Sequence, residues 1–253
     1  MNVGMLSFLI ISVYFFLFFL VGTFIRNNSI VDMGWGIGFV ILNLILTFLY
    51  PITLGTFIFT VFLTIWGLRL FLHIFKRNYN KPEDFRYATW RKEWGKWVVL
   101  RSFFQVYLLQ AVFMWVVAFP IHTLYPAKQP ITYLTILGVL IWIIGFAFEA
   151  IGDKQLSDFI HNPSNKGKII ETGLWKYTRH PNYFGEATLW WGLALISYSL
   201  SCNGLSFIGA AFITFSLCFI SGVPLLEKRN ASKPGYDEYK RKTSVFIPWF
   251  PKK

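Results

Sequence analysis

Residues 173–186 bring cations, hydrogen-bonding side chains and a proline together at the start of an apolar run. Pro181 suits the first turn of a helix, because the N–H that proline lacks has no intrahelical partner there. The remaining N–H groups of that turn and the positive end of the helix dipole attract anions. Since Lys176, Arg179 and His180 directly precede it, this helix start is predicted to bind an anion such as a phosphate.

Acidic residues form a second set of candidate groups. Glu149 and Asp153 are four residues apart, as are Asn182 and Glu186, so each pair lies on one helical face. Two carboxylates on one face near a helix C-terminus repel each other. Glu149 and Asp153 therefore need partners, either cations from neighbouring loops or the hydroxyls of a ligand. Carboxylates commonly hold the ribose hydroxyls of nucleotides, and a salt bridge to a loop is an equally open interpretation.

A polar stripe runs through another apolar segment. Arg69 and His73 are four residues apart, with Trp66 before them and Arg77 after them at helical spacing. An ionisable group at the bilayer centre costs about 2.5–3.5 kcal/mol, so four aligned positions favour a cavity lining over snorkelling at the interface. Asp32 opens a different apolar run. It is interpreted either as a helix cap or as a catalytic acid that faces these basic groups.

Membrane helices must position these groups. The 253-residue chain is 55% hydrophobic and only 14% charged, and its apolar runs approach the roughly 20 residues that cross a bilayer. We predict an all-α integral membrane protein, a single domain over residues 1–253 with no repeat or linker. Its bundle of about seven transmembrane helices is expected over residues 5–24, 35–50, 54–75, 103–125, 132–151, 187–201 and 204–224.

The net charge of +12 indicates the topology of these spans. Of the Lys and Arg residues, eight lie between 76 and 101, five between 154 and 179, and eight from 228 onward. These stretches follow predicted spans three, five and seven, whereas the loop at 120–131 carries only Lys128. By the positive-inside rule the N-terminus is outside and the C-terminus is cytoplasmic. The same charge attracts anionic lipid or an anionic cofactor, and nucleic acid is not an expected partner.

Several nucleotide and metal motifs are absent from the sequence. There is no glycine-rich dinucleotide fingerprint, no phosphate-binding loop and no nucleophile elbow. Cys202 and Cys218 lie in or beside apolar segments and form no metal or redox pair. We therefore expect no metal site, and a nucleotide would be held by loops and helix ends of the bundle.

The segment from Leu174 to Glu186 and several short motifs elsewhere in the chain carry a resemblance to a known family. These short motifs are Val31-Asp32-x-x-Trp35-Gly36, Trp66-Gly67-x-Arg69-Leu70-x-x-His73, Glu83-Asp84-x-Arg86-Tyr87, Asp153-x-Gln155-Leu156, Ser221-Gly222-Val223-Pro224-Leu225-Leu226-Glu227, and the close from Pro234-Gly235-Tyr236 through Arg241-Lys242-Thr243-Ser244 to Pro248-Trp249-Phe250-Pro251. In combination they resemble the DUF1295 proteins, an uncharacterised bacterial branch of the steroid 5-alpha-reductase superfamily.

The resemblance implies an oxidoreductase that uses NADPH, without flavin or metal, to transfer hydride to the activated C=C bond of a lipophilic enone, steroid-like or another lipid. It implies a substrate cavity in residues 1–130 and a cofactor-binding half in residues 131–253. Asp32 and His73 fall near the superfamily's acid and tyrosine that polarise a substrate carbonyl, with Arg69 orienting them, although the residue types differ. The cofactor-binding residues carried over are Glu149, Asp153, Arg179, His180, Asn182, Tyr183, Glu186, Arg229, Tyr239 and Arg241.

Two alternatives stay open. The core Arg179-His180-Pro181-x-Tyr183-x-Gly185 is similar to that of isoprenylcysteine and phospholipid methyltransferases, which use S-adenosylmethionine. That alternative leaves the Asp32 motif and the stripe of Arg69 and His73 unexplained. A non-catalytic sterol- or lipid-binding protein would use the stripe as a relay. We expect a monomer in contact with membrane lipids and a lipophilic substrate, in a bacterial inner membrane or alternatively the endoplasmic reticulum.

Overall fold

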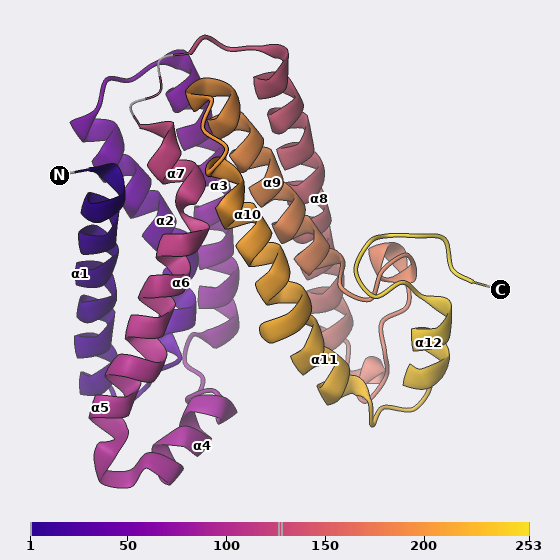
Figure 1. Cartoon of the computed structure of the whole chain (residues 1–253). Helices are drawn as coiled ribbons and strands as arrows, with labels where there is room; N and C mark the ends of the chain where they lie inside the picture. Colours follow the sequence, from indigo (N-terminus) through magenta and orange to yellow (C-terminus); the bar gives the residue numbers. More distant parts are fainter. Residues whose placement is uncertain (1, 126, 128, 253) are drawn as a thin grey trace. The chain divides into compact units, whose positions relative to one another are not determined.

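Helices dominate the computed structural model, which describes residues 2–125, 127 and 129–252 (Figure 1). The α-helices are α1 Val3–Phe24, α2 Ile30–Leu49, α3 Leu54–Asn78, α4 Phe85–Trp94, α5 Val98–Ser102, α6 Leu109–Val117, α7 Phe119–Leu124, α8 Tyr133–His161, α9 Pro181–Ser201, α10 Ser206–Phe215, α11 Val223–Asn230 and α12 Tyr236–Lys242. Short 3-10 turns are η1 Gly95–Trp97, η3 Pro163–Asn165 and η4 Gly173–Lys176, and π-helical turns are η2 Phe103–Leu108 and η5 Ser216–Ile220. The predicted all-α membrane fold is confirmed.

Among the residues that the structure describes, six helical stretches are long and apolar enough to cross a membrane: Val3–Phe24, Ile30–Leu49, Leu54–Asn78, Phe85–Val117, Tyr133–His161 and Ser206–Asn230. Helix α9 covers the sixth predicted span with 21 residues but is not among the six. It carries Asn182 and Glu186 in its first turns and serines in its last turns, which lower its mean hydropathy. The expectation of about seven spans therefore holds for six of them.

Most spans are longer than the apolar runs that predicted them. Helix α2 begins at Ile30 rather than residue 35, α8 continues to His161 rather than residue 151, and α9 begins at Pro181. Each added turn carries at least one charged side chain, and a helix keeps its backbone hydrogen bonds when it continues past an apolar run. The run predicted at 103–125 instead ends a broken helical stretch that starts at Phe85. Lys128, which entered the charge count, lies outside the described residues.

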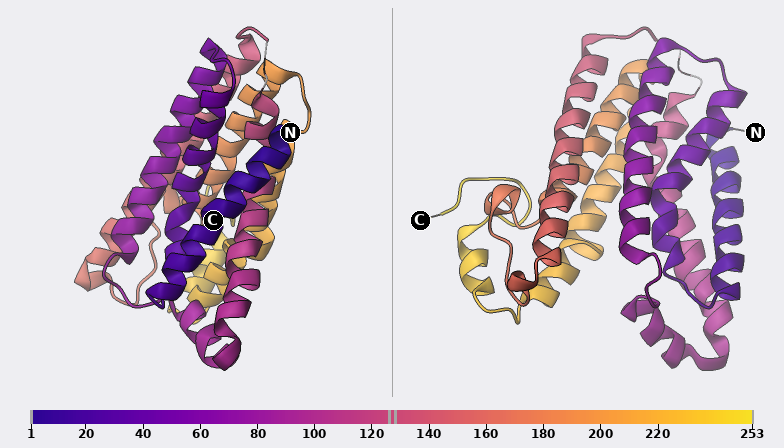
Figure 2. Two further views of the ribbon diagram at one scale, coloured as in Figure 1. Left: turned by 90° about the vertical axis from the view of Figure 1, so that its left-hand side faces the viewer. Right: turned by 180° about the vertical axis from the view of Figure 1, so that it is seen from behind.

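Two compact units make up the chain. The first unit comprises Met1–Ile131 with Ser197–Ile208, and the second comprises Thr132–Ile196 with Gly209–Lys253. In the first unit α1 packs on α2 and α6, and α2 packs on α3. Figure 2 shows these four helices side by side from two further directions.

Helices α2 and α3 of the first unit approach each other at two glycines. A Cβ atom on Gly36 would lie 2.3 Å from the carbonyl oxygen of Gly67 and 3.1 Å from the N atom of Phe71. Small residues allow such close backbone contact between membrane helices. Because consecutive helices joined by a short turn run antiparallel, the turn of α2 that carries Asp32 lies at the level of residues 71–75 of α3.

Helices α8 and α9 of the second unit are also in backbone contact. The glycines that line the contact repeat every seven residues, or about two helical turns, at Gly138, Gly145 and Gly152 on α8 and at Gly185 and Gly192 on α9. A Cβ atom on Gly185 would lie 2.3 Å from the backbone N of Glu149. This crossing therefore fixes the position of Glu149 beside the first turns of α9.

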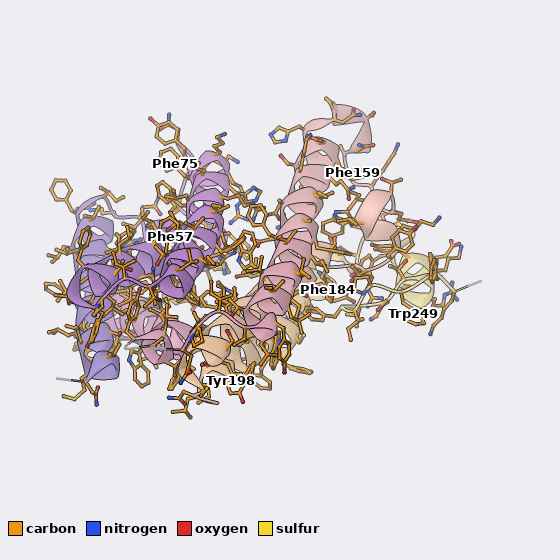
Figure 3. All side chains as sticks on the ribbon, turned by 90° about the horizontal axis from the view of Figure 1, so that it is seen from above. Phe57, Phe75, Phe159, Phe184, Tyr198 and Trp249 are labelled. Carbon is orange, nitrogen blue, oxygen red and sulfur yellow. The ribbon has the colours of Figure 1, made fainter. Side chains whose placement is uncertain are left out.

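The outward faces of the spans are apolar. On α3, Phe57 and Phe75 are 56% and 37% exposed (Figure 3). Soluble proteins rarely expose large continuous apolar surfaces, so these faces suit contact with lipid chains. The exposed large side chains of α1 are Met5, Phe8, Leu9, Val13, Phe16, Leu17, Leu20, Val21 and Phe24.

Candidate functional site

Asp32 lies in the first turn of α2, where two side chains of α4 bind its carboxylate. The Tyr87 hydroxyl donates to Oδ1 at 2.9 Å, and Nη2 of Arg86 donates to Oδ2 at 3.2 Å. Arg86 also donates to Asp84, the N-cap of α4. The N-cap of α2 is Ser29, so the interpretation of Asp32 as a helix cap is wrong. Its carboxylate joins α2 to α4 instead.

A second ion pair fixes the segment before α4. Arg91 donates to both carboxylate oxygens of Glu83, at 2.8 and 2.9 Å, and the backbone N–H of Asn28 donates to Glu83 at 2.7 Å. Burial raises the pKa of Glu83, but the bonds from Arg91 and Asn28 outweigh it and hold this pKa below its ordinary value. The side chain of Asn28 donates to Ser102 of α5 at 2.9 Å. These bonds hold α4 against the loop before α2.

The predicted polar stripe on α3 lies close to the turn of α2 that carries Asp32. Arg69 and His73 are half-buried, and both take part in interactions. Asp32 is attracted by the charge of Arg77, and its bonded partners come from α4. Sequence reasoning missed Tyr87 as a partner of Asp32, although the motif from Glu83 to Tyr87 contained the signal.

In the second unit, Arg179 is 7% exposed, and protein groups bind its guanidinium. Nε and Nη2 donate to the two oxygens of Glu227 at 2.9 and 3.1 Å. Nη1 donates to the carbonyl oxygens of Lys240 and Thr243 at 3.0 and 2.6 Å. The planar fork of arginine matches a carboxylate in this way. Arg179 thus ties the segment before α9 to α11 and to the end of α12.

Glu227 collects further donors from two other residues. Nε2 of His180 lies 3.0 Å from Oε1 of Glu227, and the Tyr236 hydroxyl donates to the same oxygen at 2.6 Å. Burial lowers the pKa of His180 despite the opposing attraction of Glu227, so the ring is neutral near pH 7. Because a carboxylate only accepts, the ring proton is assigned to Nε2. Nδ1 is then an acceptor, buried and without a hydrogen-bond partner in the part of the chain that the structure describes.

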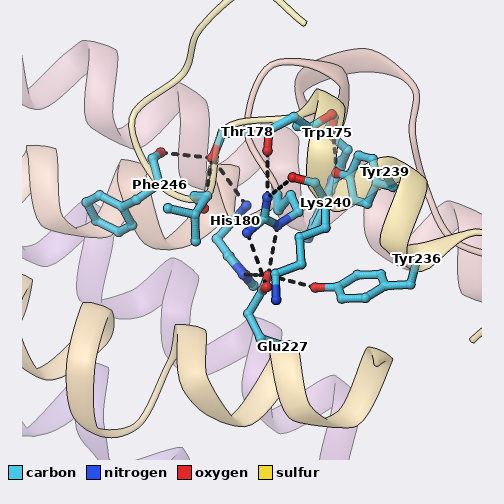
Figure 4. Close-up of polar contacts among 11 residues, drawn as sticks. Trp175, Thr178, His180, Glu227, Tyr236, Tyr239, Lys240 and Phe246 are labelled. Carbon is cyan, nitrogen blue, oxygen red and sulfur yellow. Dashed lines mark hydrogen bonds and ion pairs between the residues drawn. The ribbon is translucent and has the colours of Figure 1, made fainter. Parts of the chain in front are cut away.

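The C-terminal segment returns to the stretch before α9. Thr178 and Ser244 form an isolated parallel bridge, and the backbone N–H of Arg179 donates to Ser244 at 2.9 Å. The Thr178 hydroxyl donates to the carbonyl of Phe246 at 2.8 Å (Figure 4). The hydroxyl of Tyr239, a predicted cofactor residue, donates to the carbonyl of Trp175 at 2.6 Å. The C-terminal segment therefore holds residues 175–179, just before α9, in place.

Three predicted cofactor residues meet where α8 crosses α9. Nδ2 of Asn182 donates to Oδ1 of Asp153 at 3.0 Å, and this bond sets the orientation of the amide because the carboxylate only accepts. Oδ1 of Asn182 is buried and has no partner among the described residues. Glu149 and Asp153 are 2% and 8% exposed. The structure thus gathers two carboxylates and one amide oxygen at this crossing.

The other predicted residues are spread over the second unit. The ring of Tyr183 stacks on that of His180 at 5.7 Å and 13°, and Glu186 is half-buried on α9. Arg229 on α11 and Arg241 on α12 are exposed. Among the described residues, no three His, Cys, Asp or Glu side chains form a metal-binding group. Sequence reasoning did not single out Glu227, whose signal was its place at the end of the motif that begins at Ser221.

The helical spans, lipid-facing exterior and polar clusters at helix ends define an integral membrane protein of the all-α class. Residues 18–243 match the family described as "Protein of unknown function (DUF1295)", and the chain belongs to that family. The match, together with the similarity to steroid 5-alpha-reductases given below, confirms the predicted family resemblance.

Similar proteins come from a yeast and from mammals. An uncharacterized protein of Schizosaccharomyces pombe is 25% identical over 90% of this chain and 74% of its own length. The 3-oxo-5-alpha-steroid 4-dehydrogenase 1 of Homo sapiens is 32% identical over 45% of this chain and 41% of its own length. The human 3-oxo-5-alpha-steroid 4-dehydrogenase 2 is 26% identical over 51% of this chain and 49% of its own length. The chain thus spans less than half the length of either steroid dehydrogenase. No solved structure matches the chain.

Proposed function

We propose that this protein is a membrane reductase that uses NADPH to reduce the activated C=C bond of a lipophilic enone, either a steroid or another lipid. The observation that carries the proposal is the similarity to the 3-oxo-5-alpha-steroid 4-dehydrogenases. Buried ionisable groups in apolar helices add support, because such groups are costly in a membrane and commonly mark functional sites.

The polar groups of the second unit fit a nucleotide. Buried Glu149 and Asp153 are suited to accept hydrogen bonds from ribose hydroxyls. Nδ1 of His180 and Oδ1 of Asn182 are buried acceptors without a partner among the described residues, and the hydroxyl or carboxamide donors of NADPH would satisfy them. Arg179 acts as a positioning residue, because Glu227 and two carbonyls hold its guanidinium. The proposed cofactor set also includes Tyr183, Glu186, Arg229, Tyr239 and Arg241.

The first unit offers groups that polarise a carbonyl. Bound NADPH would supply the hydride, and negative charge would develop on the carbonyl oxygen of the enone. A hydrogen-bond donor aimed at that oxygen stabilises the transition state more than the ground state. We assign this donor to Tyr87. Its single hydroxyl proton is donated to Asp32 in this structure and would turn to the enone oxygen when the substrate binds, while Arg86 still pairs with Asp32. His73 and Arg69 of α3 are proposed as further catalytic groups. Tyr87 then takes the place of the superfamily's tyrosine.

Ligand binding by the full chain in phosphatidylcholine nanodiscs tests the proposal. NADPH is expected to raise the melting temperature, because a ligand that binds only the folded state stabilises it. Turnover is then followed as loss of NADPH with a panel of steroid and other lipid enones. Asp32→Asn is expected to abolish turnover and keep the NADPH shift. If S-adenosylmethionine raises the melting temperature and NADPH does not, the reductase proposal is overturned and the methyltransferase alternative is favoured. If no nucleotide binds, the lipid-binding alternative remains.

A further inference from the structure

A pocket outside the predicted spans opens between two loops of the second unit. Its volume is about 570 Å³, within the roughly 300–1,000 Å³ of small-molecule sites. Residues 166–171 belong to the loop between α8 and α9, and Pro234 belongs to the turn between α11 and α12. The lining residues are Lys166, Gly167, Lys168, Ile169, Glu171 and Pro234.

Hydrogen bonds hold the lysine-bearing loop in shape. Asn162 caps the η3 turn by accepting from the backbone N–H of Ser164 at 3.1 Å. The side chain of Asn165 donates to the carbonyl of Phe159 at 3.1 Å, which ties the loop back to α8. Gly167 has a φ of 80°, a left-handed conformation that glycine adopts without strain. The turn places Lys166 and Lys168 on the wall of one pocket.

Positive charge dominates this pocket. Lys166 and Lys168 are exposed, and Lys233 directly precedes the lining residue Pro234. Burial and the neighbouring charge of Arg229 lower the pKa of Lys233. Within the described part of the chain, no ion pair involves any of these three lysines or Arg229. An anion in the pocket would be attracted by the two lysines of its lining, Lys166 and Lys168.

The remaining lining residues narrow the chemistry of that anion. Glu171 places one carboxylate in a cationic pocket, where it would repel a bare phosphate but would accept a hydrogen bond from a sugar hydroxyl. Ile169 and Pro234 supply apolar surface for a ring. Lysines that neutralise phosphate and a carboxylate that binds a hydroxyl together suit a phosphorylated sugar.

We propose that this pocket binds a phosphate monoester carried on a sugar, with Lys166 and Lys168 at the phosphate and Glu171 at a neighbouring hydroxyl. This assignment rests on the proposed function, under which the group is the 2′-phosphate that distinguishes NADPH from NADH. An anionic lipid headgroup presents the same phosphate chemistry, and the experiment below separates the two sources.

The test uses the full chain in phosphatidylcholine nanodiscs as wild type and as a Lys166→Ala/Lys168→Ala double variant. Lys154→Ala is the matched control, because Lys154 is an exposed lysine of the same unit that pairs with Asp158 outside the pocket. The double variant should bind NADPH and 2′,5′-ADP about tenfold or more weakly, as expected for lost charge-assisted bonds. Binding of NADH should not change, and Lys154→Ala should match the wild type.

The other possible results of this experiment each decide between the pocket and the proposed function. If the double variant binds NADPH as tightly as the wild type does, the pocket is not the phosphate site, and the reductase proposal is unaffected. If the wild type binds no nicotinamide nucleotide, the proposed function fails. Binding to vesicles that contain phosphatidic acid then decides about the pocket. Binding that the double variant loses supports a phosphate site with lipid as its source, and binding that it keeps overturns the site.

Discussion

Glu227 binds Arg179 through both oxygens, at 2.9 and 3.1 Å, although the two residues are 48 positions apart in the sequence. A buried ion pair stabilises a protein only where further hydrogen bonds satisfy both charges. Here His180 and Tyr236 complete the carboxylate, and two backbone carbonyls complete the guanidinium. The pair therefore organises the start of α9, α11 and the chain end as one cluster.

Glu227→Gln is expected to destabilise the protein by about 3–5 kcal/mol, because it leaves the buried guanidinium of Arg179 without a counter-charge. Melting of the purified chain in detergent, or denaturant unfolding where it is reversible, measures the loss. Glu238→Gln is the control, since Glu238 is exposed and pairs with Lys242 on the surface of α12, and should leave the melting temperature unchanged. Equal effects of the two variants would contradict the organising role of Glu227.

Acid should weaken the same cluster through His180. Burial lowers the pKa of His180, against the pull of Glu227, so the unfolded chain takes up the proton at a higher pH than the folded chain does. The stability that the neutral ring contributes is thus complete above about pH 6.5, the unfolded value, and is lost as the pH falls through the lower folded pKa. The melting temperature should fall on acidification below about pH 6.5.

A His180→Gln variant isolates this effect, because glutamine still donates to Glu227 and does not titrate. Its melting temperature should depend less on pH than that of the wild type over the same range. Glu83 also has a lowered pKa, but a carboxyl group acts at more acidic pH, below its unfolded value of about 4.3. Identical pH profiles of variant and wild type would exclude His180 as the titrating group.

Helices were predictable wherever one physical signal dominates. The unbroken apolar runs of α1 and α3 gave these spans within a few residues, and Pro181 was correctly placed at the start of α9. The apolar runs alone missed the first turns of α2 and α9 and the last turns of α8, because each of these turns carries charged side chains. Hydropathy reports contact with lipid, and helix ends depend on local hydrogen bonds instead.

Single residue chemistry was predictable, but side-chain pairings were not. Arg179 and His180 were expected to bind an anion at a helix start, and the structure pairs both with the carboxylate of Glu227. No local spacing reveals a partner 48 residues away. The bond from Tyr87 to Asp32 likewise joins residues 55 positions apart. It depends on the placement of α4 beside the first turn of α2, which the ion pair of Glu83 with Arg91 stabilises.

Gly145→Ala should destabilise the second unit. A Cβ atom on Gly145 would lie 2.4 Å from the backbone N of Leu189 and 2.7 Å from the carbonyl oxygen of Gly185, and backbone atoms of α9 cannot move aside without separating the helices. Overpacking of this kind typically costs about 1–3 kcal/mol. Gly204→Ala is the matched control, because a Cβ atom there meets nothing within 4 Å. A melting temperature that falls equally in both variants would argue against close α8–α9 packing.

Tyr87→Phe tests the proposed donor of the first unit. The change removes one hydroxyl that donates to Asp32 and should cost about 1 kcal/mol of stability. Loss of one donor to a developing oxyanion should lower kcat by about 10²–10³-fold, with the NADPH shift in melting temperature unchanged.

Tyr14→Phe is the control, because the Tyr14 hydroxyl also donates within this unit, to the carbonyl of Gly34 at 2.7 Å, and has no proposed part in the chemistry. Its stability loss should be similar while turnover stays at the wild-type level. Equal kcat values in the two variants would remove Tyr87 from the mechanism and leave His73 as the donor to be tested next.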